Sequence, residues 1–316
     1  MNSAPGRNAM TTDLLNKYLL EDRSTRIQTV DLTDAWQTGL AHQSYPDVVR
    51  NLLGELCAAS VLLASNIKFE GSLVLQLQGD GPLALIVVEC QSDLSLRATV
   101  QMRQEFVVPD NASFQSLLNG NGNGRFIVIL DPTDRQEGQQ PYQGIVPMEG
   151  DSVARVLEHY MKQSEQLDTH IWLAADGRRA TGMLLQRLPD HGGTSEDAAA
   201  HQESWERASI LAKTLTQQEL LSETPETVIR RLFWEEPLLT FEPQAVRWFC
   251  PCTRERVGNM LKMLGQAEIE SILSEREKVD IACNFCGKPY TFDAVDCARL
   301  FIDGGSSADP EKPVAH

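Results

Sequence analysis

The sequence predicts an α+β protein in three parts: a core domain of β-sheet layers with packed helices, a helical linker, and a small C-terminal domain rich in cysteine. Three observations support this. Residues 1–189 mix strand-like alternation with helical periodicity, residues 190–247 hold short amphipathic segments, and residues 248–303 carry five of the seven cysteines. The leader at 1–11 reads as loose, and we expect the tail at 304–316 to be disordered.

The core domain contains clear strand signals. Residues 94–103 alternate apolar and polar side chains, which is typical of a strand with one buried face. Residues 73–78 and 83–90 are further strand candidates, joined by the turn Gly79-Asp80-Gly81-Pro82. Other strands are expected at residues 125–130 and 144–147 and on both sides of Asp176-Gly177, and helices at residues 49–63 and 153–161.

The linker, residues 190–247, begins with a glycine-containing break and carries eleven acidic and five basic residues. Its expected helices, one of which starts at Thr224-Pro225 with proline in the first helical position, are short. Short amphipathic helices need a partner surface to stay folded. We therefore predict a metastable linker; the alternative is a constitutive helical linker packed on the core domain.

The composition narrows the functional classes. The chain has 28 basic and 44 acidic residues in 316, a formal charge of −16, which opposes general binding to nucleic acid or anionic membranes. The longest wholly apolar run has six residues, far short of a spanning helix, and the N-terminus lacks a signal-peptide core, so we expect a cytoplasmic protein. The glycine-rich stretch at 119–124 precedes a strand instead of opening a helix, which favours a flexible turn over a phosphate loop.

Four cysteines form two tight pairs. Cys250 and Cys252 make a C-x-C motif, and Cys283 and Cys286 make a C-x-x-C motif thirty residues later. Strands are expected at residues 279–282 and 289–292, with Gly287 in the turn behind the second pair, and two helices between the pairs, the first of which ends at Gly265. Two such cysteine pairs brought together give a tetrahedral four-sulfur site that suits one Zn²⁺ ion. Because four protein ligands leave no open position for water, the site is closed, and we expect no metal-dependent hydrolase and no other enzyme.

The short spacing of the first pair favours redox regulation over a purely structural zinc site. Cysteines two residues apart have α-carbons near the upper limit for a disulfide, so a bond between them would be strained. Strained, exposed disulfides are labile and often regulatory. Basic neighbours of the cysteines, Arg254, Arg256 and Lys288, would favour the reactive thiolate, although they also fit solvated helix or strand positions.

With these residues in place, the chain resembles the bacterial redox-regulated heat-shock holdase family, also called the 33 kDa chaperonin family. The resemblance rests on the C-x-C and C-x-x-C motifs with their long spacer, and on the block from Gly79 to Glu89. It implies a holdase that is inactive when reduced and zinc-bound. On oxidation it would join Cys250 with Cys252 and Cys283 with Cys286, release zinc, unfold its C-terminal region, dimerise, and hold unfolding client proteins without ATP.

The free energies of zinc binding and of disulfide formation agree with the expected release of zinc and unfolding. A structural zinc contributes roughly 10–16 kcal/mol in small peptides. Disulfides that close loops of only three and four residues would each contribute about 2 kcal/mol on the chain-entropy model, and they would not join the two halves of the site. Oxidation is therefore expected to release zinc and loosen the small domain.

Two other functions stay open at this point. One is a structural zinc module for protein or nucleic-acid docking, and the other is a thiol oxidoreductase that uses Cys283 and Cys286, although these lack the expected strand-to-helix context. Cys57 and Cys90 are interpreted as buried small hydrophobic residues, whereas Cys297 lies close enough in the sequence to join thiol exchange.

Overall fold

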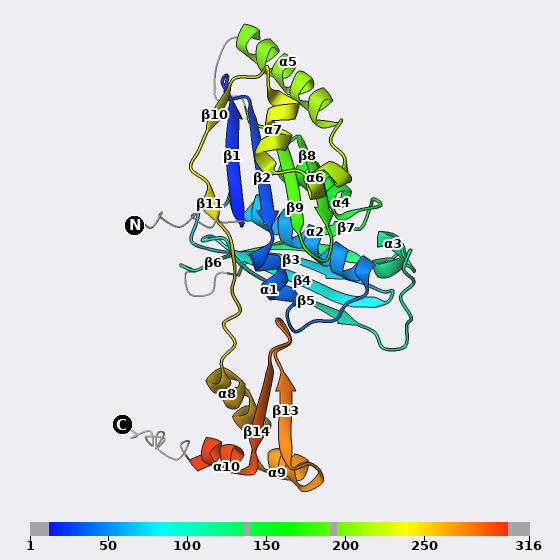
Figure 1. Ribbon diagram of the computed structural model, residues 1–316, viewed down its shortest axis with the longest axis vertical. Helices are drawn as coiled ribbons and strands as arrows, with labels where there is room; N and C mark the ends of the chain where they lie inside the picture. The colour runs from blue at the N-terminus through cyan, green and yellow to red at the C-terminus, as the bar shows by residue number, and fades with distance from the viewer. Residues whose placement is uncertain (1–12, 136–139, 190–194, 303–316) are drawn as a thin grey trace, which may run out of the picture. The chain divides into compact units, whose positions relative to one another are not determined.

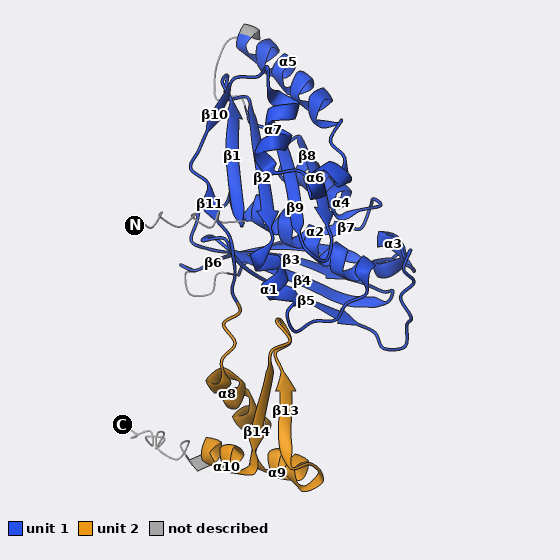
Figure 2. Ribbon diagram, in the orientation of Figure 1, with its two compact units in different colours: residues 1–249 blue, residues 250–316 orange. Residues whose placement is uncertain are grey.

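The computed structural model describes most of the chain, namely residues 13–135, 140–189 and 195–302 (Figure 1). These residues form two compact units that divide between Phe249 and Cys250, here called the core unit and the cysteine unit (Figure 2). The expected leader at 1–11 and tail at 304–316 lie outside the described residues. The α+β class predicted from the sequence is confirmed. No described helix has both the length and the apolar character needed to cross a membrane.

The first sheet of the core unit is antiparallel throughout. Its strands lie in the order β10 (Leu238–Thr240), β1 (Leu14–Leu20), β2 (Thr25–Leu32), β9 (Ala180–Arg187) and β8 (Thr169–Ala175), and β11 (Gln244–Ala245) also pairs with β1. The sequence analysis did not predict β1 or β2. Both faces of this sheet are covered, so most positions of β2 are buried and no polar face marks it as a strand.

The second sheet contains the strands that the alternation predicted. They lie in the order β12 (Arg247–Trp248), β5 (Ser95–Met102), β4 (Leu83–Gln91), β3 (Gly71–Gln78), β6 (Arg125–Pro132) and β7 (Tyr142–Pro147). All neighbours are antiparallel except β12, which pairs in parallel with β5. The turn from Gly79 to Pro82 joins β3 and β4 as expected.

Helix α2 (Asp47–Ala64) lies between the two sheets and carries much of the core (Figure 1). Buried side chains of α2 share one hydrophobic cluster with Val30 and Leu184 of the first sheet and with Leu75 and Val88 of the second. The approach is close, because a Cβ on Gly54 would stand only 2.5 Å from the Cβ of Ala175. The shorter helices of this unit are α1 (Asp34–Leu40), α3 (Phe114–Leu118) and α4 (Val153–Gln163).

Three further helices cover the opposite face of the first sheet. They are α5 (Ser195–Ala212), α6 (Gln217–Ser222) and α7 (Pro225–Phe233). Helix α7 starts as predicted, with Thr224 as its N-cap and Pro225 in the first turn. After α7 the chain returns to the sheets as β10, β11 and β12, three short strands that the sequence analysis did not predict.

The cysteine unit is small. It consists of α8 (Arg254–Leu264), α9 (Gln266–Glu275), the hairpin of β13 (Lys278–Ala282) and β14 (Pro289–Asp293), and α10 (Ala294–Ile302). Its buried cluster has seven residues: Val257, Leu261, Ile269, Val279, Tyr290, Phe292 and Cys297. The helical pair and the hairpin both follow the sequence prediction.

Candidate metal centre and helix-covered sheet face

The two cysteine pairs lie in different local structures. Cys250 and Cys252 lie in the extended segment just before α8, whose first turn is capped by the Thr253 side chain, which accepts a hydrogen bond from the Arg256 amide at 3.2 Å. The second pair lies in the turn of the β13–β14 hairpin. The two motifs therefore present their sulfurs from a helix start and a hairpin tip.

The hairpin tip has the geometry of a metal-binding knuckle. The amide of Gly287 donates to the carbonyl of Cys283 at 2.8 Å, and the amide of Cys283 donates to the carbonyl of Lys288 at 3.0 Å. Gly287 has a φ of 68°, in the left-handed region that glycine adopts without steric cost. A side chain at this position would strain the turn that aims the second pair.

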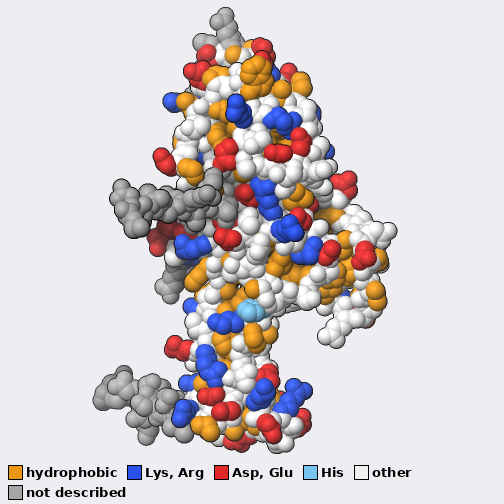
Figure 3. All heavy atoms as spheres, in the orientation of Figure 1, with side chains coloured by type: hydrophobic (Ala, Val, Ile, Leu, Met, Phe, Trp, Pro, Cys, Tyr) orange, Lys and Arg blue, Asp and Glu red, His pale blue; other side chains and the backbone are white. Residues whose placement is uncertain are grey.

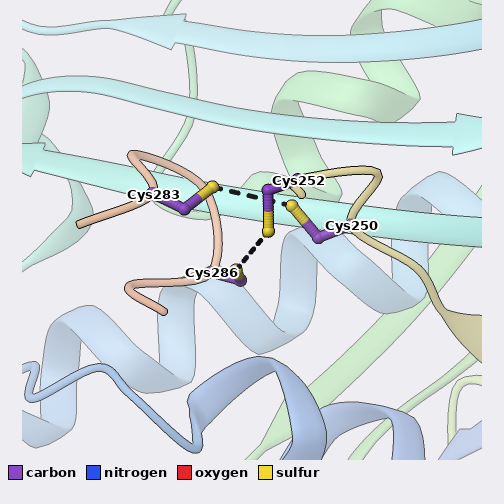
Figure 4. Close-up of side chains that lie close together, drawn as sticks. All are labelled: Cys250, Cys252, Cys283 and Cys286. Carbon is purple, nitrogen blue, oxygen red and sulfur yellow. Dashed lines mark hydrogen bonds between the residues drawn. The ribbon is translucent and has the colours of Figure 1, made fainter. Parts of the chain in front are cut away.

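The four sulfur atoms converge (Figure 4), since all of them lie within 4.8 Å of one another. The Sγ atoms of Cys250 and Cys283 are 3.7 Å apart, and those of Cys252 and Cys286 are 3.4 Å apart. Zinc–sulfur bonds of about 2.3 Å in a tetrahedron place sulfurs about 3.8 Å apart, whereas a disulfide needs about 2.05 Å. The arrangement is that of four free thiols spaced to hold one metal ion.

Burial and hydrogen bonding shift the pKa values of these thiols in different directions. Cys286 is buried and the other three are half-buried. Burial raises the pKa of the Cys250 and Cys286 thiols. Burial alone would also raise the pKa of Cys252, but hydrogen bonds with Tyr290 and the other cysteines outweigh it and lower that pKa. Because a divalent metal takes cysteine as the thiolate, metal binding at this site would release protons.

Tyr290 is a supporting residue that the sequence analysis placed only in the return strand. Its hydroxyl donates to the carbonyl of Cys252 at 3.0 Å, so it ties the hairpin to the segment of the first cysteine pair. The aromatic position opposite Ile281 in the hairpin could be anticipated from the strand pattern. Its hydrogen bond to a residue 38 positions away could not.

The basic residues beside the cysteines have structural partners. Arg254 stacks 4.1 Å above the Phe292 ring and forms an ion pair with Asp296 at 2.6 Å. Arg256 donates to the carbonyl of Pro251 at 3.1 Å. Lys288 lies 5.6 Å from the centre of the Tyr290 ring. These contacts brace the segments around the sulfurs.

The remaining cysteines lie elsewhere. Cys57 and Cys90 are completely buried in the core unit, and burial raises the pKa of both thiols. Cys297 is buried in the small cluster of the cysteine unit. None of the three belongs to the four-sulfur group among the described residues. Cys57 and Cys90 therefore behave as the small hydrophobic residues that the sequence suggested.

A second candidate site is the apolar face of the first sheet under α5–α7. Ile27, Met183 and Leu185 of the sheet are completely buried against these helices. The helices contribute large apolar side chains to the same cluster, among them Trp205 and Phe233. If α5–α7 separated from the sheet, both surfaces would become exposed.

Arg179 fastens these helices to the sheet, and the sequence analysis did not single it out. Its guanidinium pairs with the carboxylate of Asp31 at 2.6 and 2.8 Å. It also donates to the carbonyls of Leu221 and Glu223, at the end of α6, at 3.1 and 2.8 Å. The pairing links residues 148 positions apart, so no local sequence signal marks it.

The glycine-rich stretch at 119–124 forms a turn before β6. The carboxylate of Asp80 accepts hydrogen bonds from the amides of Asn121 and Asn123. These amides, which a phosphate loop would offer to a ligand, therefore bind a side chain of the chain itself.

The chain is similar in sequence to proteins of one family. A family model described as Hsp33 protein matches residues 13–293. The chain is 47% identical over 291 residues to a 33 kDa chaperonin of Methylobacillus flagellatus, covering 92% of this chain and 94% of that protein. It is 44% identical over 289 residues to a 33 kDa chaperonin of Chromobacterium violaceum, with the same coverage of both chains.

A solved structure is similar in fold. The crystal structure of a 33 kDa chaperonin from Thermotoga maritima matches with a TM-score of 0.73 and 20% identity, covering 93% of this chain and 99% of that one. At this identity the likeness concerns the fold alone.

Proposed function

Because the chain belongs to the Hsp33 family, we propose that it is a redox-regulated holdase, inactive when reduced and zinc-loaded and active on unfolding proteins after oxidation. The observation that carries the proposal is the convergence of four sulfurs from two distant segments. A metal bound there joins Cys250 and Cys252 to Cys283 and Cys286.

The donor set fits zinc. Four thiolates in a tetrahedral arrangement are the ligands of structural zinc sites, and the 3.4 and 3.7 Å contacts are close to the required spacing. When bound, the ion supplies a cross-link between the helix start and the hairpin tip. Since all four positions are filled by protein, we assign no catalytic role to the site.

Oxidation would remove this cross-link. The four metal-bound thiolates lose four electrons to form two disulfides and the metal ion leaves; two molecules of peroxide accept these electrons, with four protons from solvent, to form four of water. We propose the pairs Cys250 with Cys252 and Cys283 with Cys286, which the family resemblance implies. All four sulfurs start within 4.8 Å, so these pairs need only local movement. Each disulfide closes a short loop and leaves the two segments unconnected.

We propose that loss of the folded cysteine unit frees the chain that follows β12, and that α5–α7 then separate from the first sheet. Three buried polar groups would make this separation easier. In the described part of the chain, no hydrogen-bond partner is found for Asn16 Nδ2, Thr29 Oγ1 or Ser209 Oγ. Such groups weaken an interface because each loses its water without a replacement. Thr29 faces a small cavity under α6 and α7. The apolar surfaces exposed on separation are the proposed binding site for unfolding clients.

The remaining features of the proposal concern partners and location. We propose a homodimer in the oxidised state, no nucleic-acid or membrane partner, and a cytoplasmic location. The formal charge of −16 would keep client complexes soluble. On the face drawn in Figure 3, the described acidic and basic side chains are interspersed, so that face offers no continuous basic surface to a polyanion.

The decisive experiment follows metal and activity in the same sample. We expect the reduced, zinc-loaded protein to suppress aggregation of a heated client poorly, and peroxide with mild heat to activate it. About one zinc per chain should reach a chromogenic chelator as activity rises. Cys297→Ala should still bind zinc and still be activated by peroxide, because Cys297 is buried in the small cluster and lies outside the sulfur group.

Other outcomes would contradict the proposal. Equal suppression by both forms would exclude the switch, and thiols that resist peroxide while zinc stays bound would indicate the structural docking module instead. A peptide map with Cys250 or Cys252 joined to Cys283 or Cys286 would show that a disulfide replaces the metal clamp. Turnover of a dithiol substrate would indicate an oxidoreductase.

A further inference from the structure

A cavity of about 570 Å³ lies between the two sheets of the core unit, and neither the metal centre nor the helix-covered face includes it. Its walls come from both sheets and from the C-terminal ends of α2 and α4. Most of the lining is apolar, including Leu63, Leu73, Val128, Leu130, Met161 and Leu167. A volume of this size is typical of sites for small organic molecules, roughly 300–1,000 Å³.

One part of the lining is basic. Arg26 and Lys68 line the cavity, and neither forms an ion pair with any residue that the structure describes. The Arg26 guanidinium has five N–H donors, and in the described part of the chain one of them is used, on Asn66 Oδ1. Donors therefore remain for a bound group.

Lys17 adds a third positive charge near the cavity. Burial, followed by the neighbouring charge of Arg26, lowers the pKa of Lys17. Lys17 donates to the carbonyl of Ser65 at 2.8 Å, at the end of α2. The dipole of α2 stabilises the positive charges of Lys17 and Arg26 there. A helix end carries only about half an elementary charge, so it does not neutralise both. The local balance in this strongly acidic chain is positive.

The carboxylate in the lining is already engaged. Glu165 accepts a hydrogen bond from the Tyr160 hydroxyl at 2.7 Å. Gln186, at the end of β9, is likewise engaged with Thr169 at 3.0 Å. An anionic group beside Arg26 would thus meet free donors, while the rest of the cavity accepts an apolar body.

We propose that this cavity binds an amphipathic organic anion, namely a monocarboxylate with an unbranched apolar chain of medium length. The carboxylate would pair with the Arg26 guanidinium, with Lys68 nearby, and the chain would lie along the apolar walls from the second sheet, α2 and α4. Charge-assisted hydrogen bonds of this kind are about twice as strong as neutral ones. The site is independent of the cysteines.

The test uses the reduced, zinc-loaded full chain and a fluorescent fatty-acid probe, dansylaminoundecanoate. We expect saturable binding of about one probe per chain and displacement by decanoate but not by decanol. Arg26→Gln should weaken binding at least tenfold. Arg125→Gln is the matched control, because Arg125 carries the same charge at the exposed first residue of β6 and does not line the cavity.

Cavity-filling variants locate the site. Val128→Phe and Leu130→Phe should each reduce probe binding at least tenfold while the far-ultraviolet spectrum stays unchanged. The proposal is wrong if the wild type shows no saturable binding, if decanol displaces the probe as well as decanoate does, or if Arg26→Gln binds normally. Normal binding by a folded Phe variant would place the probe on another surface and would equally overturn it.

Discussion

Different interactions stabilise the core unit and the cysteine unit. The core unit packs two six-stranded sheets around α2 in one large apolar cluster, with a second cluster under α5–α7. The cysteine unit has one cluster of seven buried residues and a group of four sulfurs. Burial of apolar surface responds to heat and denaturant but not to oxidants, whereas a thiolate site responds directly to them. We therefore expect one oxidant to unfold the cysteine unit while the two sheets and α2 of the core unit stay folded.

The largest expected effect comes from removing one sulfur. Cys286→Ser should prevent stable zinc binding and abolish hydrogen-exchange protection across residues 254–293, because the metal contributes roughly 10–16 kcal/mol to such small units. Protection in β3 and β4 should stay unchanged. Cys57→Ala is the matched control: it should destabilise the core unit by about 1–2 kcal/mol and leave the metal bound. A protected cysteine unit in Cys286→Ser would remove the difference between the two units.

The same substitution in both units sharpens the comparison. Phe126 and Phe292 are both completely or almost completely buried, at 0% and 2% exposed. Phe126→Ala should lower the unfolding free energy of the core unit by about 3–5 kcal/mol, measured by denaturant titration. Phe292→Ala should instead weaken zinc binding about a hundredfold or more, since folding and metal binding are coupled there. Equal zinc affinity in wild type and Phe292→Ala would contradict that coupling.

A smaller effect is expected where α6 meets the first sheet. Arg179→Met leaves the Asp31 carboxylate and two carbonyls without their donor, which should cost about 2–4 kcal/mol. We expect faster hydrogen exchange in α6 and α7 and measurable client binding by the reduced protein. Lys162→Met, which breaks an exposed pair with Asp168, should change stability by less than about 0.5 kcal/mol. Unchanged exchange in Arg179→Met would show that packing alone holds these helices.

The smallest effect depends on pH. Burial raises the pKa of Glu55 on α2 from an ordinary 4.5 to about 7. The folded state thus holds this proton more tightly than the unfolded state, and stability falls as pH rises from about 4.5 through 7. Glu55→Gln should remove this loss. The free energy of unfolding, measured by thermal unfolding, should then be higher in the variant than in the wild type by about 2 kcal/mol at pH 8 and by less at pH 5. A constant difference across pH would contradict the assignment.

The sequence predicted what depends on local patterns. Strands β3 to β6, helices α2 and α4, the proline-started α7 and the hairpin of the cysteine unit all follow from periodicity and turn residues. Each cysteine pair is visible in the sequence because the spacing within a motif is local, and the four sulfurs lie within 4.8 Å of one another.

The rest depends on contacts between distant residues. Strand β2 is buried at most positions, and β1 mixes buried and half-buried positions, so neither shows a regular alternation. Strands β10 to β12 have two or three residues each and exist because β1 and β5 offer partners. The Arg179–Asp31 pair and the hydroxyl of Tyr290 act across long sequence separations. Neither periodicity nor spacing reports such contacts.

The pairing of β10 and β11 with β1 has a practical consequence for handling the protein. Together these short strands occupy the outer backbone groups of β1, whose sequence LLNKYLL is mostly apolar. An unpaired apolar edge of this kind recruits strands from other chains and starts aggregation. Truncated chains that end before residue 238 would leave that edge open, whereas chains that end at Phe249 keep it sealed.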